Sequence, residues 1–117
     1  MYTNKLTLER KNQYIMNVKL NVRSVNFDAD RKLIGFIQER LNKLTHFFDR
    51  IIEADVYLKV DNNHEMENKI VEIRLMIPGN DLFAKKTARN FEAATNEVAE
   101  ALRRQAKKRK EKVWGVQ

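Results

Sequence analysis

The highest concentration of charged residues in this sequence is a run of cations near its C-terminal end. Residues 103 to 112 read RRQAKKRKEK, which places seven cations against one anion in ten residues. The run continues an apolar stripe at helical spacing, made of Phe91, Ala94, Val98 and Leu102. Residues three and four apart share a helix face, so the stripe ties one face to a core and turns the cations outward. Rigid, spaced cations suit a structured polyanion, and nucleic acid is the first candidate partner.

An earlier helical pattern adds basic side chains to this candidate surface. Arg40 and Lys43 are three residues apart and lie off its apolar stripe, so they project from one face. If the two helices lie side by side, this row and the row of Arg104, Lys107 and Lys108 flank a groove that fits an RNA backbone. An ordinary solvated basic surface is the alternative, and it stays open for Arg40 and Lys43 in particular. The predicted RNA-binding set is Arg40, Lys43, Lys86, Arg89, Arg103, Arg104, Lys107, Lys108, Lys110 and Lys112.

The sequence gives little indication of a metal site or a catalytic site. His46 and His64 have no matching set of metal ligands, and the absence of cysteine excludes a thiolate metal site and a disulfide framework. Glu53 and Asp55 fall on the outward side of a strand pattern, where carboxylates stay solvated. With three glycines and no nucleophile elbow or phosphate loop, the sequence predicts no enzyme, no metal site and no cofactor.

Length and charge limit the class of protein. The chain has 117 residues, 43% of them hydrophobic, which suits one modest core rather than two domains. Its net charge of +7 at pH 7 attracts phosphates to the whole surface. No apolar run approaches the ~20 residues that span a bilayer, and the N-terminal segment lacks the apolar core of a signal peptide. We therefore expect a cytoplasmic protein with no membrane partner.

Alternating hydrophobicity predicts four strands. They cover residues 16–22, 52–60 and 69–77, with a fourth strand from Leu82. Lys86 falls on the inward side of the fourth strand, so we expect it near the strand end, reaching for solvent. On the core face of the second strand the alternation places Ile52, Ala54, Val56, Leu58 and Val60.

Two helices complete the predicted elements. The first follows Asp28 and Asp30, which offer N-cap oxygens, and ends near Phe47 or Phe48. The second begins near Asn90 and carries the cations described above. The core stripe of the first helix consists of Leu33, Ile37, Leu41, Leu44 and Phe48.

These elements predict one α+β domain in the order β-α-β-β-β-α. Two helices with one apolar stripe each, and a sheet with one strongly apolar face, favour a four-stranded sheet with both helices packed on one face. The first and second strands should be parallel, and the later strands should form an antiparallel meander. We expect residues 1–15 to be a poorly ordered extension without a fold role, residues 16–112 to form the domain, and residues 113–117 to be a tail.

Several motifs in this order resemble one protein family. Residues 43–51 read KLTHFFDRI, similar to a Lys-Leu-x-x-Phe-Phe-Asp-Arg-Ile run that closes the family's first helix. The second helix opens with Asn90 and the pair Ala93-Ala94, and it continues to Arg104, Gln105, Lys108 and Lys110 in an Arg-Gln-x-x-Lys-x-Lys run. Over residues 16–112 the sequence resembles the short form of the bacterial ribosome hibernation promoting factor, also called ribosome-associated inhibitor. This family is similar to sigma-54 modulation protein.

Two positions depart from the family pattern. Glu92 stands where an aromatic residue usually precedes the alanine pair, and Ala101 stands where a lysine is usual. Neighbouring residues offer replacements, since Phe91 can take over the packing and Arg103 and Lys107 can supply the charge. The family's long form carries a further C-terminal dimerisation domain, and this sequence ends before one.

The resemblance implies a function as well as a fold. It implies a partner in the small ribosomal subunit and its ribosomal RNA, at the channel used by messenger RNA and transfer RNA, with no role for DNA. By the same resemblance, occupancy of this channel would exclude translation in nutrient-limited or stationary cells. A basic domain without catalytic groups can inhibit in this way by occlusion alone.

Two other functions stay open at this point. A general double-stranded RNA-binding domain has the order α-β-β-β-α, which this chain shows once its first strand is set aside. A modulator of a protein partner, such as a sigma factor, would use the exposed face of the sheet.

Overall fold

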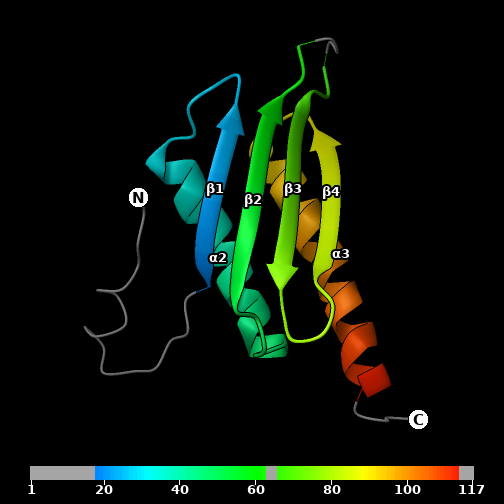
Figure 1. Cartoon of the computed structure of the whole chain (residues 1–117). Helices are drawn as coiled ribbons and strands as arrows, with labels where there is room; N and C mark the ends of the chain where they lie inside the picture. The colour runs from blue at the N-terminus through cyan, green and yellow to red at the C-terminus, as the bar shows by residue number, and fades with distance from the viewer. Residues whose placement is uncertain (1–17, 63–65, 114–117) are drawn as a thin grey trace.

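The computed structural model describes residues 18–62 and 66–113, with side chains as far as Glu111. Both ends of the chain, including the predicted extension at residues 1–15 and most of the predicted tail, lie outside the described residues. The element order confirms the predicted β-α-β-β-β-α arrangement (Figure 1). The elements are β1 (Lys19–Val25), α2 (Arg31–Phe47), β2 (Glu53–Val60), β3 (Lys69–Met76), β4 (Leu82–Ala88) and α3 (Phe91–Val113).

The four strands form one sheet in the order β1-β2-β3-β4. β1 pairs with β2 in parallel, because α2 carries the chain back between them, and the remaining pairs are antiparallel. Both helices lie on the same face of the sheet, as the two apolar stripes predict (Figure 1). No helix of the described residues covers the opposite face of the sheet, and we call this face the open face.

The start and the buried stripe of α2 follow the predicted pattern. Of the two candidate caps, Asp30 is the one used, and its Oδ1 accepts a hydrogen bond from the Leu33 backbone N at 2.8 Å. The helix ends before Phe48, whose backbone N donates to the Leu44 carbonyl at 2.7 Å. All five predicted stripe residues are buried, namely Leu33, Ile37, Leu41, Leu44 and Phe48.

A similar cap starts α3, where Asn90 Oδ1 accepts a hydrogen bond from the Ala93 backbone N at 2.7 Å. The predicted stripe is buried from Phe91 to Leu102, and it continues to Ala106, which is 2% exposed. Phe91 also stacks on Phe27, with ring centroids 4.6 Å apart, so the loop after β1 is packed against the start of α3. The buried stripe therefore extends into the cationic part of the helix, as far as Ala106.

The strands differ from the predicted ones at several positions, including the end of the third strand at Met76 instead of residue 77. β1 continues beyond the predicted end to Val25. Ile52 precedes β2 and is 61% exposed, so its predicted inward position is wrong. Beyond Lys86, which is partly buried, β4 continues to the buried Ala88, so the inward alternation resumes after one lysine.

Two side chains of α3 fasten the helix to the far edge of the sheet. The Gln105 amide donates from Nε2 to the Phe83 carbonyl at 2.8 Å and accepts at Oε1 from the Phe83 backbone N at 3.2 Å. The amide thereby bonds both backbone groups of Phe83 at the β4 edge, which would otherwise be free to pair with another strand. Arg109 donates from a terminal guanidinium nitrogen to the Asn80 carbonyl in the turn before β4, at 3.0 Å. Neither helix of the described chain has an apolar stretch long enough to cross a membrane.

Candidate nucleic-acid interface

Arg40 links the two helices where they run side by side. Its Nε donates to Asn96 Oδ1 on α3 at 2.8 Å, and its guanidinium lies 4.2 Å from the centroid of the Phe36 ring. A terminal nitrogen also lies 3.7 Å from a carboxylate oxygen of Glu39. The side chain is 28% exposed, so Arg40 presents one part of its guanidinium to solvent in a fixed orientation. Such a restrained cation loses little conformational entropy when it binds a phosphate.

A second link lies at the last turn of α2, around Phe47. Lys110 Nζ on α3 donates to the Phe47 carbonyl at 3.2 Å and lies 5.3 Å from the centroid of the Phe47 ring. The Arg103 guanidinium lies 5.9 Å from the same centroid. The cations beside α2 are therefore held by an aromatic ring and a helix C-terminus, both of which attract positive charge. We call Arg40, Phe47, Asn96, Arg103 and Lys110 the helix seam.

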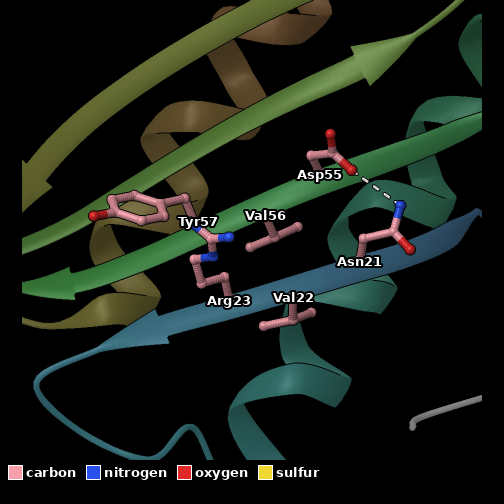
Figure 2. Close-up of a pocket in the computed structure, with 6 residues that line it drawn as sticks. All are labelled: Asn21, Val22, Arg23, Asp55, Val56 and Tyr57. Carbon is pink, nitrogen blue, oxygen red and sulfur yellow. Dashed lines mark hydrogen bonds between the residues drawn. The ribbon is translucent and has the colours of Figure 1, made fainter.

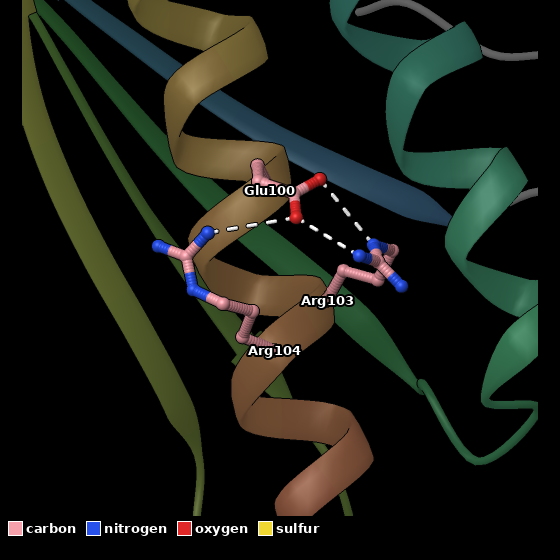
Figure 3. Close-up of polar contacts among 3 residues, drawn as sticks. All are labelled: Glu100, Arg103 and Arg104. Carbon is pink, nitrogen blue, oxygen red and sulfur yellow. Dashed lines mark hydrogen bonds and ion pairs between the residues drawn. The ribbon is translucent and has the colours of Figure 1, made fainter.

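Glu100 holds two arginines of α3 that point to different sides of the helix. Its carboxylate lies 2.9 Å from a terminal nitrogen of Arg103 and 3.5 Å from one of Arg104. Figure 3 shows Arg103 on the side of α2 and Arg104 on the side away from it. The hydrogen bond from Arg103 holds the pKa of the Glu100 carboxyl below its ordinary value and raises the pKa of Arg103. At neutral pH the carboxylate is ionised and competes with phosphate for both guanidinium groups.

The predicted groove between two cationic rows is lined on the α3 side by other residues than expected. The side chains that contact α2 are Arg103 and Lys110, whereas Arg104 points to the other side (Figure 3). Lys108 follows Arg104 by four residues and so shares its side of the helix. Successive helical residues turn by about 100°, so a change of one residue decides which cation faces the neighbouring helix.

The remaining predicted site residues are spread over three elements. Lys43 on α2 and Lys107 on α3 are exposed. Arg89 is exposed directly after β4, and Lys86 is partly buried within that strand. The side chain of Lys112 lies outside the described residues. The structure therefore gathers the helix cations along the seam and on the outer side of α3, with Arg89 at one end of the sheet.

Two residues with structural roles were missed by the sequence patterns. Arg109 is part of the cationic run, and no partner was predicted for it. In the structure it donates a hydrogen bond to the Asn80 carbonyl in the turn before β4. Its position gives a usable signal, because it lies eighteen residues after the buried Phe91, which is five helical turns and hence the same face. Gln105 gives no comparable signal, because its bonds to Phe83 depend on where the sheet edge lies.

The acidic and histidine side chains were also considered as metal ligands. Among the described residues, no group of three or more acidic or histidine side chains is placed to hold a metal ion. His46 is exposed at the end of α2, and His64 lies outside the described residues. The contacts of the helix seam are hydrogen bonds and cation–ring contacts that join α2 to α3.

Comparison with known proteins places this chain in a family. The family model described as Sigma 54 modulation protein / S30EA ribosomal protein matches residues 20–114. The chain belongs to this family. A ribosome hibernation promoting factor of Pseudomonas putida is 30% identical over 95 residues, covering 81% of this chain and 89% of that protein. A protein of the same name from Klebsiella oxytoca is 28% identical over 96 residues, covering 82% and 97% of the two chains.

Solved structures show the same fold as this S30EA family protein. The N-terminal domain of Thermus thermophilus Protein Y matches with a TM-score of 0.67 and 19% identity, over 80% of this chain and 98% of that domain. A ribosomal subunit interface protein from Coxiella burnetii matches with a TM-score of 0.71 and 16% identity, over the same shares. These matches confirm the predicted architecture of four strands and two helices.

Family membership also confirms the resemblance seen in the sequence. The structure gives several of the quoted motif residues in this S30EA family protein a physical role. Asn90 caps α3, Gln105 pairs with the sheet edge, and Phe47 and Lys110 join the two helices. The motif residues Phe47, Gln105 and Lys110 therefore make contacts that hold α3 against α2 and β4.

Proposed function

We propose that this protein is a ribosome hibernation factor that binds the small ribosomal subunit at the channel for messenger RNA and transfer RNA, and inhibits translation by occupying it. Two observations support the proposal. The chain belongs to a family in which similar proteins are named ribosome hibernation promoting factors, and its helix seam holds restrained cations on a rigid surface. The protein would act in the cytoplasm, where its partner is assembled.

The proposed contact is between the helix face and the phosphates of ribosomal RNA. Arg40 and Arg103 are pre-oriented by neighbouring rings and side chains, which favours fixed phosphates of a folded RNA. Lys43, Lys107 and Lys108 are exposed and can adjust to nearby phosphates. The proposed set remains Arg40, Lys43, Lys86, Arg89, Arg103, Arg104, Lys107, Lys108, Lys110 and Lys112.

Occlusion requires a rigid body of suitable size rather than a catalytic group. The fold is a slab with extents of 44 × 39 × 19 Å, with the sheet as one layer and the helices as the other. A body of this size, anchored by cations on one layer, can block a channel that must hold an RNA strand. Ligands that fill the same channel should compete with it.

The decisive experiment is co-sedimentation with small ribosomal subunits in a sucrose gradient. Purified protein should sediment with empty subunits, and subunits filled beforehand with messenger RNA and transfer RNA should exclude it. Naked duplex RNA of similar concentration serves as the competitor that distinguishes general RNA binding. Binding to filled subunits at the same level, or equal competition by duplex RNA, would replace occlusion with a general double-stranded RNA-binding function.

A further inference from the structure

The open face of the sheet carries an ordered array of polar and aromatic side chains. The strand register aligns Arg23, Tyr57, Glu72 and Lys85 in one row across the four strands. The next row consists of Asn21, Asp55, Arg74 and Phe83. Neighbouring strands lie about 4.8 Å apart, so each row places its groups within reach of a single nucleotide or its neighbour.

Two aromatic rings occupy this array. Tyr57 on β2 and Phe83 on β4 border the same hollow, of about 350 Å³, together with Asp55, Glu72 and Arg74. Phe83 is 41% exposed, and the Arg74 guanidinium lies 5.2 Å from the centroid of its ring. An exposed ring beside an arginine offers a surface on which a nucleic acid base can stack.

A second hollow lies on the other side of Tyr57. It measures about 540 Å³, and its lining includes Asn21, Arg23, Asp55 and Tyr57. Figure 2 shows these side chains on the near side of the strands, with the helices behind them. Tyr57 and Asp55 therefore border both hollows, and each hollow contains hydrogen-bonding groups.

The polar groups of this face match the edges of unpaired bases. Asn21 Nδ2 donates to Asp55 Oδ1 and to Glu53 Oε2, each at 2.9 Å, which orients both carboxylates (Figure 2 shows the first bond). Carboxylate oxygens accept hydrogen bonds from base amino groups such as that of cytosine. Glu72 is partly neutralised by Lys85, whose Nζ lies 3.7 Å away. The carboxylates are thus placed for base contacts between the cations.

The charge balance of the open face favours a polyanion. Cations outnumber carboxylates on it, with Lys19, Arg23, Lys59, Arg74 and Lys85 against Glu53, Asp55 and Glu72. Phe83 is the one exposed large apolar side chain that the strand register places on this face within the described residues. A protein partner would require a larger apolar centre. The surface fits RNA better.

We propose that the open face is a second RNA site, which binds a single-stranded segment. Tyr57 and Phe83 stack on its bases, and Arg23 and Arg74 contact its phosphates. Duplex RNA does not fit, because its bases are already stacked and paired and cannot reach the rings. The site faces away from the helix seam, so one molecule can hold folded RNA on its helices and an unpaired strand on its sheet (Figure 1).

The test measures binding of a fluorescein-labelled, eight-nucleotide single-stranded RNA to the full chain by fluorescence anisotropy, with a duplex of the same sequence in parallel. Tyr57→Ala and Phe83→Ala should each weaken single-strand binding at least roughly fivefold, as loss of a stacked base requires. Tyr57→Phe and Phe83→Tyr should retain it, because both keep a ring. Ile52→Ala is the matched control, because it removes an exposed apolar side chain that precedes β2 and lines neither hollow.

A second measurement examines the arginines separately from the rings. Arg23→Gln and Arg74→Gln should each reduce the slope of log affinity against log salt by about 0.7, the value for one phosphate of a single strand. Circular dichroism of each variant should show an unchanged fold, since all four side chains are on the surface. Wild-type affinity in both alanine variants, or an equal loss of duplex binding, would overturn the proposal.

Discussion

Thr95 of α3 is fully buried, and within the described part of the chain its hydroxyl has no hydrogen-bond partner. A buried polar group without a partner lowers stability, because the water that it bonded in the unfolded chain is lost. Valine has nearly the same shape and lacks the hydroxyl. Valine at position 95 should therefore give a more stable folded protein than threonine does.

We predict that Thr95→Val raises the free energy of unfolding by about 1 kcal/mol, the usual order for removing an unpaired hydroxyl from a core. Urea denaturation followed by circular dichroism measures it. Thr45→Val is the control, because Thr45 Oγ1 donates to the Asn42 carbonyl at 2.6 Å and its loss should lower stability. A lower stability of Thr95→Val would show that the hydroxyl has a partner in solution.

Glu100 limits the charge that α3 presents to RNA. Because its pKa is lowered in the folded protein, its ion pairs are present above the unfolded pKa and are lost as the pH falls through the folded value. At pH 7 the carboxylate therefore remains beside Arg103 and Arg104. A phosphate that binds these arginines competes with it for their N–H groups.

We predict that Glu100→Gln increases affinity for small subunits and for RNA several-fold at pH 7, because both guanidinium groups lose a competing anion. Glu97→Gln is the matched control, since it makes the same charge change on an exposed position of α3 without a described ion pair. Filter binding at several salt concentrations measures the affinities. An equal gain in both variants would mean that net charge alone acts, without a particular role for Glu100.

At the scale of elements, the two helices depend on their buried stripes for attachment to the sheet. Leu41 is 0% exposed in the middle of the α2 stripe. Its neighbours along the stripe, Ile37 and Leu44, are buried as well, so no solvent path reaches the position. The helix seam in turn exists only while α2 packs in this orientation.

We predict that Leu41→Asp unfolds the domain, because it places an unpaired carboxylate in the core. Far-ultraviolet circular dichroism should show loss of the native signal and of a cooperative melt. Lys32→Asp is the control, since Lys32 is exposed in the first turn of α2, where a carboxylate is favourable. A native, cooperatively melting Leu41→Asp protein would mean that α2 can pack in another orientation.

For the whole molecule, the two layers separate two kinds of surface. The helix layer carries the densest cations and the restrained seam, whereas the sheet layer carries mixed charges and two aromatic rings. Binding to the small subunit is proposed for the helix layer. Equal changes of charge on the two layers should therefore have unequal effects.

We predict that replacing Arg104 and Lys108 together by Glu leaves the fold intact and sharply weakens binding to small subunits. Two phosphate contacts are lost and repulsion is added, and the salt slope should fall by about 0.7 to 0.9 for each lost contact. The control replaces Lys19 and Lys59 by Glu, an identical change of net charge at open-face positions that line neither hollow. Equal weakening by both pairs, measured by co-sedimentation, would contradict a binding surface on the helices.

The sequence by itself determined the elements, their order and most of the core. Burial repeats every two residues in a strand and every 3.6 in a helix, so the stripe from Leu33 to Phe48 and that from Phe91 to Leu102 could be predicted from local spacing. Caps are also local, as Asp30 and Asn90 show. The cationic character of α3 and the likeness to the S30EA family needed no tertiary information.

The tertiary structure alone decided which of these residues meet. Arg103 rather than Arg104 faces α2, Gln105 pairs with the edge of β4, and Tyr57 shares a hollow with Phe83. Each pairing depends on the rotation of a helix about its axis or on the register between strands. Those quantities are set by packing between segments distant in sequence, and a shift of one residue changes every partner, so no local pattern specifies them.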